Sequence, residues 1–315
     1  MIEVKNLTKR YGSHCAVDNI SFTVDEGEIL GFLGPNGAGK STTMNILTGY
    51  LSATDGTVTV NGHDILDEPN EAKANIGYLP EIPPLYPDMT VREYLDFMYD
   101  LKKCVLPRVK HITEICKVMK IENVYGRLIK NLSKGYKQRV GMAQALIGNP
   151  PVLILDEPTV GLDPNQIIEM RGLIKSLGKH HTVILSSHIL PEIEAVCDRV
   201  VIINSGKIVA DDTAENLSAK FSEDRRLQVS IAGPAKETAD LIASIPGVIG
   251  VQAMGSREAG VETFAVETEP GSDIRRDLFD RLAKRGWPLL ASKPLAMSLE
   301  DIFINLTMHQ NGGVR

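Results

Sequence analysis

Hydrophobic and polar positions alternate over the first seven residues, and the apolar residues of segment 20–24 also recur at every second position. This period of two is typical of strands with one buried face. Residues 28–33 are apolar after Glu28, which predicts a buried strand that leads into a glycine-rich turn. A helix is expected over residues 40–48. The chain therefore begins with a β-rich segment followed by a strand–turn–helix unit.

The middle of the chain changes from strand to helix patterning. Residues 56–62 predict a strand with a hairpin-like close, and residues 90–150 predict a mostly helical subdomain. Apolar positions in this subdomain recur at helical spacing, as at Val91, Tyr94, Leu95 and Met98. The chain then alternates strand, helix and strand over residues 152–155, 165–177 and 182–186. Such alternation predicts an α/β fold built on a mostly parallel sheet.

A second pattern begins after about residue 215. Residues 216–226 are polar and charged, so a linker is expected between a first domain, 1–215, and an accessory domain, 227–315. The elements predicted for this C-terminal α+β domain follow the order β-α-β-β-α-β over residues 227–231, 236–244, 248–253, 261–267, 273–285 and 289–292. That order is compatible with a ferredoxin-like fold.

Composition narrows the class of protein. Of 315 residues, 43% are hydrophobic and 23% are charged, and the formal net charge is −6, so bulk attraction to nucleic acid is not expected. The longest apolar stretches are far shorter than the roughly 20 residues that span a bilayer, and the N-terminus has no signal pattern. The four cysteines are widely spaced and suggest neither disulfides nor a zinc site. These features predict a cytoplasmic protein.

A glycine-rich motif carries the first chemical signal. It matches G-x-x-x-x-G-K-[ST] between a predicted strand and a predicted helix, where backbone amides and the helix N-terminus can hold a phosphate chain. The full pattern in this context makes a chance turn a poor alternative. The expected nucleotide-binding residues are Gly34, Pro35, Asn36, Gly37, Ala38, Gly39, Lys40, Ser41 and Thr42. Lys40 is expected to reach the β- and γ-phosphates of a nucleotide such as ATP, and Ser41 to ligate Mg²⁺.

Acidic and imidazole groups follow later strands. Asp156 ends the strand over residues 152–155 and can hold Mg²⁺, while Glu157 is placed to deprotonate a water. His188 follows the next strand, and the carboxyl ends of parallel strands gather at one edge of a sheet, so a γ-phosphate contact is expected. A solvated Asp-Glu turn and a structural histidine are the alternatives. The phosphate loop upstream favours the catalytic interpretation.

One segment identifies a family. Leu132-Ser133-Lys134-Gly135-Tyr136-Lys137-Gln138-Arg139 resembles the signature motif L-S-G-G-Q of the ATP-binding-cassette (ABC) ATPases. The order of the motifs also resembles that family, and the resemblance covers roughly residues 1–215. An ordinary helix start with Ser133 as N-cap is compatible with the same residues.

The resemblance implies a P-loop NTPase fold, ATP hydrolysis and further roles. Tyr11 is similar to the aromatic residue that stacks on adenine. Ser133 and Gly135 would contact the γ-phosphate held by a second copy of the domain, and Asp163 would lie at that interface. ATP and Mg²⁺ would then be enclosed between two copies, and hydrolysis would reopen the dimer.

Some positions depart from the family pattern. Glu81 stands where the family has glutamine, although a carboxylate can still ligate Mg²⁺. Lys134 and Tyr136 replace a glycine and a glutamine of the signature, and Val160 replaces a serine. Nucleotide binding and hydrolysis are expected to persist, and the rate of hydrolysis is the property that these departures leave open.

Two segments resemble the ABC-2-type exporter subfamily, which includes the gliding-motility ATP-binding subunits. They are residues 79–86, with the sequence Leu-Pro-Glu-Ile-Pro-Pro-Leu-Tyr, and residues 298–303, with the sequence Ser-Leu-Glu-Asp-Ile-Phe. The second segment is equally compatible with an ordinary capped helix.

The resemblance therefore implies the ATPase subunit of an exporter. It would work with a separate transmembrane permease subunit and lie on the cytoplasmic face of the cell membrane. The alternatives are a soluble cassette ATPase that acts on nucleic acid or the ribosome, and a nucleotide switch that does not hydrolyse. The first usually has two cassettes or a coiled-coil insertion, and the presence of Glu157 and His188 disfavours the second.

Overall fold

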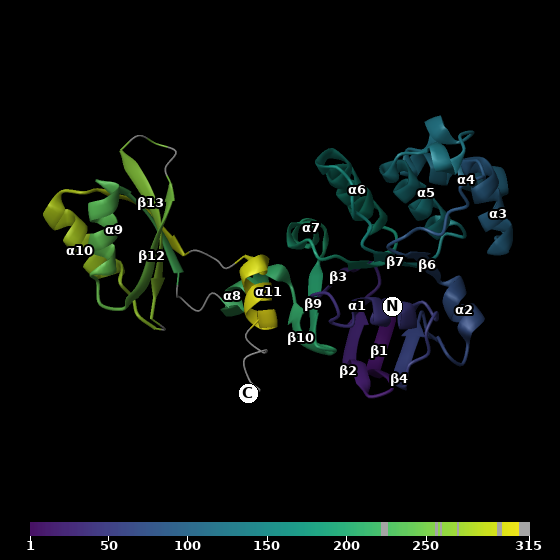
Figure 1. The fold of residues 1–315 in the computed structure, drawn as a ribbon, viewed down its shortest axis with the longest axis horizontal. Helices are drawn as coiled ribbons and strands as arrows, with labels where there is room; N and C mark the ends of the chain where they lie inside the picture. Colours follow the sequence, from purple (N-terminus) through teal and green to yellow (C-terminus); the bar gives the residue numbers. More distant parts are fainter. Residues whose placement is uncertain (222–225, 256–257, 259, 270, 295–297, 309–315) are drawn as a thin grey trace. The chain divides into compact units, whose positions relative to one another are not determined.

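The computed structural model describes residues 1–221, 226–255, 258, 260–269, 271–294 and 298–308. The chain divides into two compact units, and Figure 1 colours the chain along its sequence from purple to yellow. The first unit comprises Met1–Ala214 together with a segment that begins at Phe303, and the second comprises Glu215–Ile302. In the described part of the chain, none of the helices is both long enough and apolar enough to cross a membrane.

An antiparallel sheet with the strand order β2-β1-β4-β5 forms the β-rich start. Its strands are β1 (Ile2–Tyr11), β2 (His14–Val24), β4 (Asp55–Val60) and β5 (His63–Asp64). Asn61 and Gly62, between β4 and β5, have φ angles of 52° and 86°. This is the left-handed geometry for which Asn-Gly is the favoured hairpin pair. The predicted hairpin-like close is therefore confirmed.

The larger sheet of the first unit has the strand order β10-β9-β3-β8-β7-β6. Its strands are β3 (Ile29–Leu33), β6 (Ile76–Leu79), β7 (Val152–Asp156), β8 (Thr182–Ser186), β9 (Arg199–Asn204) and β10 (Lys207–Asp212). All neighbouring pairs are parallel except β9–β10. Every residue of β3, β7 and β8 is buried, which is typical of strands covered on both faces. The predicted mostly parallel sheet is confirmed.

The two sheets of this unit share one apolar core, in which Phe22 of β2 and Phe32 of β3 lie 5.6 Å apart between ring centroids. The helices that accompany these strands are α1 (Lys40–Leu47), α2 (Pro69–Ala74), α6 (Pro164–Leu177) and α7 (Leu190–Val196). The segments that carry α1, α6 and α7 leave the carboxyl ends of β3, β7 and β8. In open parallel sheets these ends form the ligand-binding edge.

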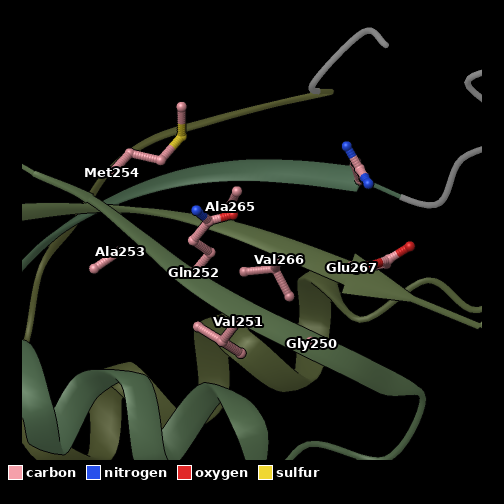
Figure 2. A pocket seen from close by; sticks show the side chains of 9 residues that line it. Gly250, Val251, Gln252, Ala253, Met254, Ala265, Val266 and Glu267 are labelled. Carbon is pink, nitrogen blue, oxygen red and sulfur yellow. The ribbon is translucent and has the colours of Figure 1, made fainter. Parts of the chain in front are cut away.

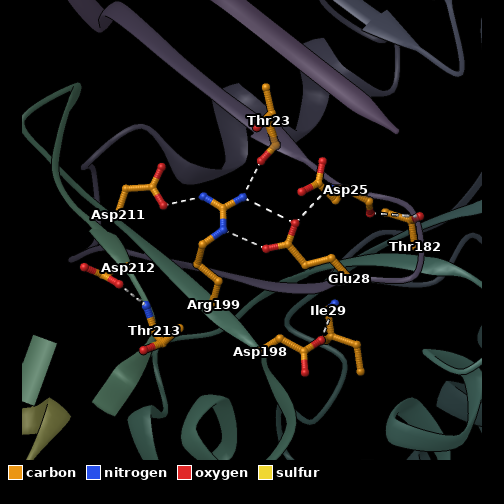
Figure 3. Close-up of polar contacts among 10 residues, drawn as sticks. All are labelled: Thr23, Asp25, Glu28, Ile29, Thr182, Asp198, Arg199, Asp211, Asp212 and Thr213. Atoms are coloured by element: carbon orange, nitrogen blue, oxygen red, sulfur yellow. Dashed lines mark hydrogen bonds and ion pairs between the residues drawn. The ribbon is translucent and has the colours of Figure 1, made fainter. Parts of the chain in front are cut away.

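Arg199 ties the amino-terminal end of β9 to its surroundings (Figure 3). Its Nε donates to Glu28 Oε1 over 2.7 Å, and its two terminal nitrogens donate to Asp211 and to the carbonyl oxygen of Thr23. Burial alone would lower the pKa of Arg199, but the hydrogen bonds to Glu28 and Asp211 raise it overall. This permanently charged side chain therefore joins β2, β9, β10 and the turn before β3.

The helical subdomain contains α3 (Val91–Leu101), α4 (Arg108–Met119), α5 (Lys134–Leu146) and the short 3₁₀ segments Glu122–Val124 and Ile129–Asn131. Thr90 and Glu93 form a capping box at the start of α3. Lys102, just after α3, donates to the carbonyl oxygens of Gln144, Ala145 and Ile147 over 2.7–3.2 Å. This contact satisfies carbonyl groups at the end of α5 and ties the subdomain to the segment that enters β7.

The second unit has the strand order β12-β13-β11-β14, with all pairs antiparallel. Its elements are β11 (Arg226–Ala232), α9 (Ala235–Ala243), β12 (Val248–Gly255), β13 (Val261–Thr268), α10 (Arg275–Arg285) and β14 (Leu289–Pro294). The connection order and the strand order are those of a ferredoxin-like sheet, as the sequence predicted. Phe264 and Val266 of β13 pack with Leu278 and Leu282 of α10.

The opposite face of this sheet is not covered by α9 and α10. Gln252 and Met254 of β12 point away from these helices and line a shallow pocket together with Ala265 and Glu267 of β13 (Figure 2).

Two helices lie where the expected domain limits did not place them. The predicted linker 216–226 largely coincides with α8 (Ala214–Phe221), while its residues 222–225 lie outside the described part of the chain. Leu217 is buried, so the polar composition concealed a helix with one apolar anchor. Helix α11 (Leu299–Met308) falls within the predicted accessory domain, but its residues from Phe303 group with the first unit. There, Asn204 Nδ2 donates to the Leu306 carbonyl oxygen over 3.4 Å.

Candidate nucleotide site

The phosphate loop connects β3 to α1, as the motif predicted. Gly37 and Gly39 have φ angles of 79° and 111°, which side chains rarely tolerate. A Cβ at Gly39 would lie 2.5 Å from the Ala16 carbonyl oxygen, so glycine is required there on steric grounds too. Gly34 is similarly confined by the backbone of Ile203. The loop is therefore held tightly between β2, β9 and α1.

Lys40 is buried at the first position of α1. Its Nζ donates to the carbonyl oxygens of Gly34 over 2.6 Å and Pro35 over 3.3 Å. Burial lowers the pKa of this amine, and the carboxylates of Glu157, Asp156 and Glu81 oppose the shift. These three carboxylates therefore act electrostatically on the Lys40 amine.

Asp156 ends β7 and is buried beside β8. The Ser186 hydroxyl donates to Asp156 Oδ1. Burial raises the pKa of the Asp156 carboxyl group, while the hydrogen bond from Ser186 opposes this shift. Ser186 fixes the orientation of the carboxylate, and sequence reasoning did not single it out. The parallel register that pairs Asp156 with Ser186 is the signal that could have identified it.

Glu157 and His188 meet across the ends of β7 and β8. Glu157 Oε2 lies 2.8 Å from His188 Nδ1, and the Glu157 side chain is largely buried whereas His188 is 55% exposed. The backbone of Glu157 has a φ of 49°, a strained conformation for this residue, and its amide donates to the Ser186 carbonyl oxygen over 3.1 Å. The expected catalytic pair is thus in direct contact.

The oxygen-bearing residues expected to hold Mg²⁺ are Ser41, Asp156 and Glu81. Ser41 and Glu81 are exposed. No group of three or more His, Cys, Asp or Glu residues in the described part of the chain could hold a metal by itself. Mg²⁺ usually takes one or two carboxylates and completes its shell with phosphate oxygens and water, so this hard-oxygen donor set fits it.

Tyr11 is the last residue of β1 and lies beside the turn that joins β1 to β2. It is paired with His14, close to Ala16, whose carbonyl oxygen abuts Gly39. Its ring is 46% exposed, and Lys9 Nζ lies 5.3 Å from the ring centroid. An exposed ring at this end of the ribbon is available for stacking.

Ser133, Gly135 and Asp163 form a second group at the starts of α5 and α6. Ser133 Oγ accepts a hydrogen bond from the Tyr136 amide, and Asp163 Oδ1 accepts one from the Gln166 amide. A Cβ at Gly135 would lie 2.6 Å from Gln166 Oε1, which explains the glycine. In the described residues no hydrogen bond or ion pair joins this group to the phosphate loop.

Contacts of Lys134 and Glu192 were not anticipated. The Lys134 amine fills the space beside Gly161, so the signature segment touches the loop after Glu157. Glu192 of α7 is buried and accepts a hydrogen bond from Thr159. Lys134 belongs to the signature segment but departs from the family pattern, and Glu192 belongs to no recognised motif; both contacts join distant parts of the sequence.

Comparisons with known proteins agree with this architecture. A family model described as ABC transporter matches residues 17–160. The bacitracin transport ATP-binding protein BcrA of Bacillus licheniformis is 39% identical over 232 residues, which cover 73% of this chain and 75% of that protein. The linearmycin resistance ATP-binding protein LnrL of Bacillus subtilis (strain 168) is 33% identical over 313 residues, or 98% of each chain.

A solved structure extends the comparison to a nucleotide-bound state. It is the dimeric post-hydrolysis state of the ATP-binding cassette MJ0796 bound to ADP and Pi. Its TM-score to this chain is 0.61 at 27% identity, with 68% of this chain and 98% of that chain covered. Together with the phosphate loop and the Glu157–His188 contact, these relatives show that the chain belongs to the ABC transporter family, as a nucleotide-binding ATPase subunit.

Proposed function

We propose that the chain is the ATP-hydrolysing subunit of an exporter of the ABC-2 type, in which residues 1–215 act with a separate transmembrane permease. The single observation that carries the catalytic part is the 2.8 Å contact between Glu157 Oε2 and His188 Nδ1. It lies at the sheet edge that also carries Lys40 and Asp156. A carboxylate held at this edge can take a proton from a water that attacks the γ-phosphate of ATP.

The remaining site residues have supporting roles in this proposal. The backbone amides of Gly34 and residues 36–39 and the Lys40 amine bind the phosphates, Thr42 adds a contact, and Tyr11 stacks on the adenine. His188 contacts the γ-phosphate and orients Glu157. When bound, Mg²⁺ would neutralise charge on the phosphate oxygens, and the residues that would hold it are Ser41, Asp156 and Glu81.

A second copy of the chain completes each site. Ser133 at the start of α5 is exposed, Gly135 is buried next to the exposed Lys134, and both residues lie outside the hydrogen-bonded group around Lys40. We assign them, with Asp163, to the nucleotide bound by the other copy. The dimeric MJ0796 cassette supports this assembly. Loss of the γ-phosphate removes contacts that hold the two copies together, so hydrolysis reopens the dimer.

A groove between the sheet and the helical subdomain supports the proposal that a permease binds this chain. Its lining includes Tyr50, Pro84, Lys73 and Lys102. Tyr50 is 79% exposed, and the lining contains two lysines but no acidic residue. Burial lowers the pKa of Lys102 to about 8. The groove fits an apolar segment that carries a carboxylate. We propose that the permease supplies this segment at the cytoplasmic face of the membrane.

Purification of the tagged chain from membranes tests this function. We expect a transmembrane protein to copurify, and Tyr50→Glu to abolish its recovery while ATP hydrolysis by the chain persists. Val109→Glu is the matched control, because Val109 is also exposed on the helical subdomain but does not line the groove. Recovery of the chain in the soluble fraction alone, or undiminished recovery of the partner with Tyr50→Glu, would contradict the proposal.

A further inference from the structure

The segments that follow β7 and β8 are joined by two contacts. The first is the partly exposed contact between Glu157 and His188. The second lies deeper, where Thr159 Oγ1 donates a hydrogen bond to Glu192 Oε2. Thr159 and Glu192 are 2% and 3% exposed, so this second contact is shielded from solvent.

Stability does not explain a carboxylate at position 192. Burial of a charged group costs several kcal/mol unless it is well paired and hydrogen-bonded. Arg171 Nη2 of α6 lies 3.9 Å from Glu192 Oε1, a long ion pair. Neither Glu192 Oε1 nor Arg171 Nε has a hydrogen-bond partner among the described residues. A buried group with incomplete compensation is more often retained for a functional reason than for folding.

The location of the contact supplies that reason. Pro158 alone separates Thr159 from Glu157, so anchoring the Thr159 side chain restricts the strained backbone of Glu157. On the other segment, Glu192 lies four residues beyond His188, in the first turn of α7, and the backbone at His188 is held by the Ile189 amide, which donates to Ser187 Oγ over 3.1 Å. The hydroxyl–carboxylate hydrogen bond therefore sets the separation of the two segments that carry Glu157 and His188.

We propose that Glu192 is a positioning residue for ATP hydrolysis, acting through Thr159 to hold the Glu157 turn against the His188 segment. Among the described residues, Glu192 has no hydrogen bond or ion pair with Glu157 or His188, so it acts on them indirectly. This inference rests on the proposed roles of Glu157 and His188.

Thr159→Val tests the proposal, because it retains the shape of the side chain and removes only the hydroxyl donor. We expect kcat for ATP to fall about 10- to 100-fold with KM changed less than about twofold, since a displaced catalytic group slows chemistry without weakening binding. Thr159→Ser retains the donor and should hold kcat within about twofold of the original chain. Glu192→Ala should match Thr159→Val, and the double variant should be no slower than either single variant.

Other results would overturn the proposal. They are an unchanged kcat in Thr159→Val, a loss in Thr159→Ser as large as in Thr159→Val, or additive losses in the double variant. Equilibrium dialysis with ATP verifies that each variant still folds and binds. Glu157→Gln separates this inference from the proposed function: if that variant is inactive and Thr159→Val is normal, only the positioning role fails. If Glu157→Gln hydrolyses ATP normally, the catalytic assignment itself fails.

Discussion

Lys40 Nζ lies 2.6 Å from the carbonyl oxygen of Gly34, so the amine spans its own loop. Its buried position, close to three carboxylates, leaves it ready to exchange carbonyl contacts for phosphate oxygens. Charge-assisted hydrogen bonds of this kind are stronger than neutral ones.

Lys40→Ala should therefore weaken ATP binding by about 10- to 100-fold, the equivalent of one or two hydrogen bonds to a charged group. Equilibrium dialysis with labelled ATP measures this directly. Lys175→Ala, at an exposed position in the last turn of α6, is the control and should bind normally. Normal retention of ATP by Lys40→Ala would refute the assignment of the phosphate loop.

Two glycines should respond in opposite directions to replacement by alanine. Gly39→Ala introduces a Cβ 2.5 Å from a backbone oxygen at a φ of 111°, so ATP affinity and stability should both fall. Gly172 in α6 has open space around it, and Gly172→Ala should raise the free energy of unfolding by about 0.5–1 kcal/mol through helix propensity. Denaturation and ATP binding measured on both variants check this, and equal effects would argue against the loop geometry.

Arg199 should contribute more to stability than an exposed ion pair. Its side chain is 23% exposed and contacts Glu28, Asp211 and the Thr23 carbonyl oxygen, so Arg199→Ala leaves partly buried acceptors unmatched. We expect a loss of about 2 kcal/mol in the free energy of unfolding. Arg92→Ala, which breaks an exposed pair with Asp96, should change it by less than about 0.5 kcal/mol. Urea unfolding compares the two variants, and equal losses would contradict a bracing role for Arg199.

Much of the first unit could be predicted because its signals are local. The glycine-rich loop lies between β3 and α1, and the apolar runs became buried parallel strands. The Thr159–Glu192 contact could not be predicted, because it joins two ordinary residue types that are 33 positions apart. Helix α8 was missed because charged residues surround its buried Leu217. Residues of α11 from Phe303 group with the first unit, and this grouping depends on tertiary contacts that the sequence does not show. The Ser298–Asp301 cap of the same helix was visible in the sequence.

Ser133 should be needed for ATP-dependent dimerisation, because we assign its hydroxyl to the nucleotide of the second copy. In a Glu157→Gln background with ATP, Ser133→Ala should shift the protein toward monomer on size-exclusion chromatography. Thr90→Ala is a matched control, since it also removes an N-cap hydroxyl, at α3, and should leave the dimer intact. Dimer loss in both variants would attribute the effect to helix capping instead.

Steady-state phosphate release from ATP by Glu157→Gln is the most direct test of the central claim that Glu157, held by His188, activates the attacking water. The substitution retains the shape of the side chain and removes its basicity. We predict a turnover at least about 100-fold below that of the original chain, with ATP binding retained and the ATP-bound dimer accumulating. Turnover equal to that of the original chain would show that another group is the base.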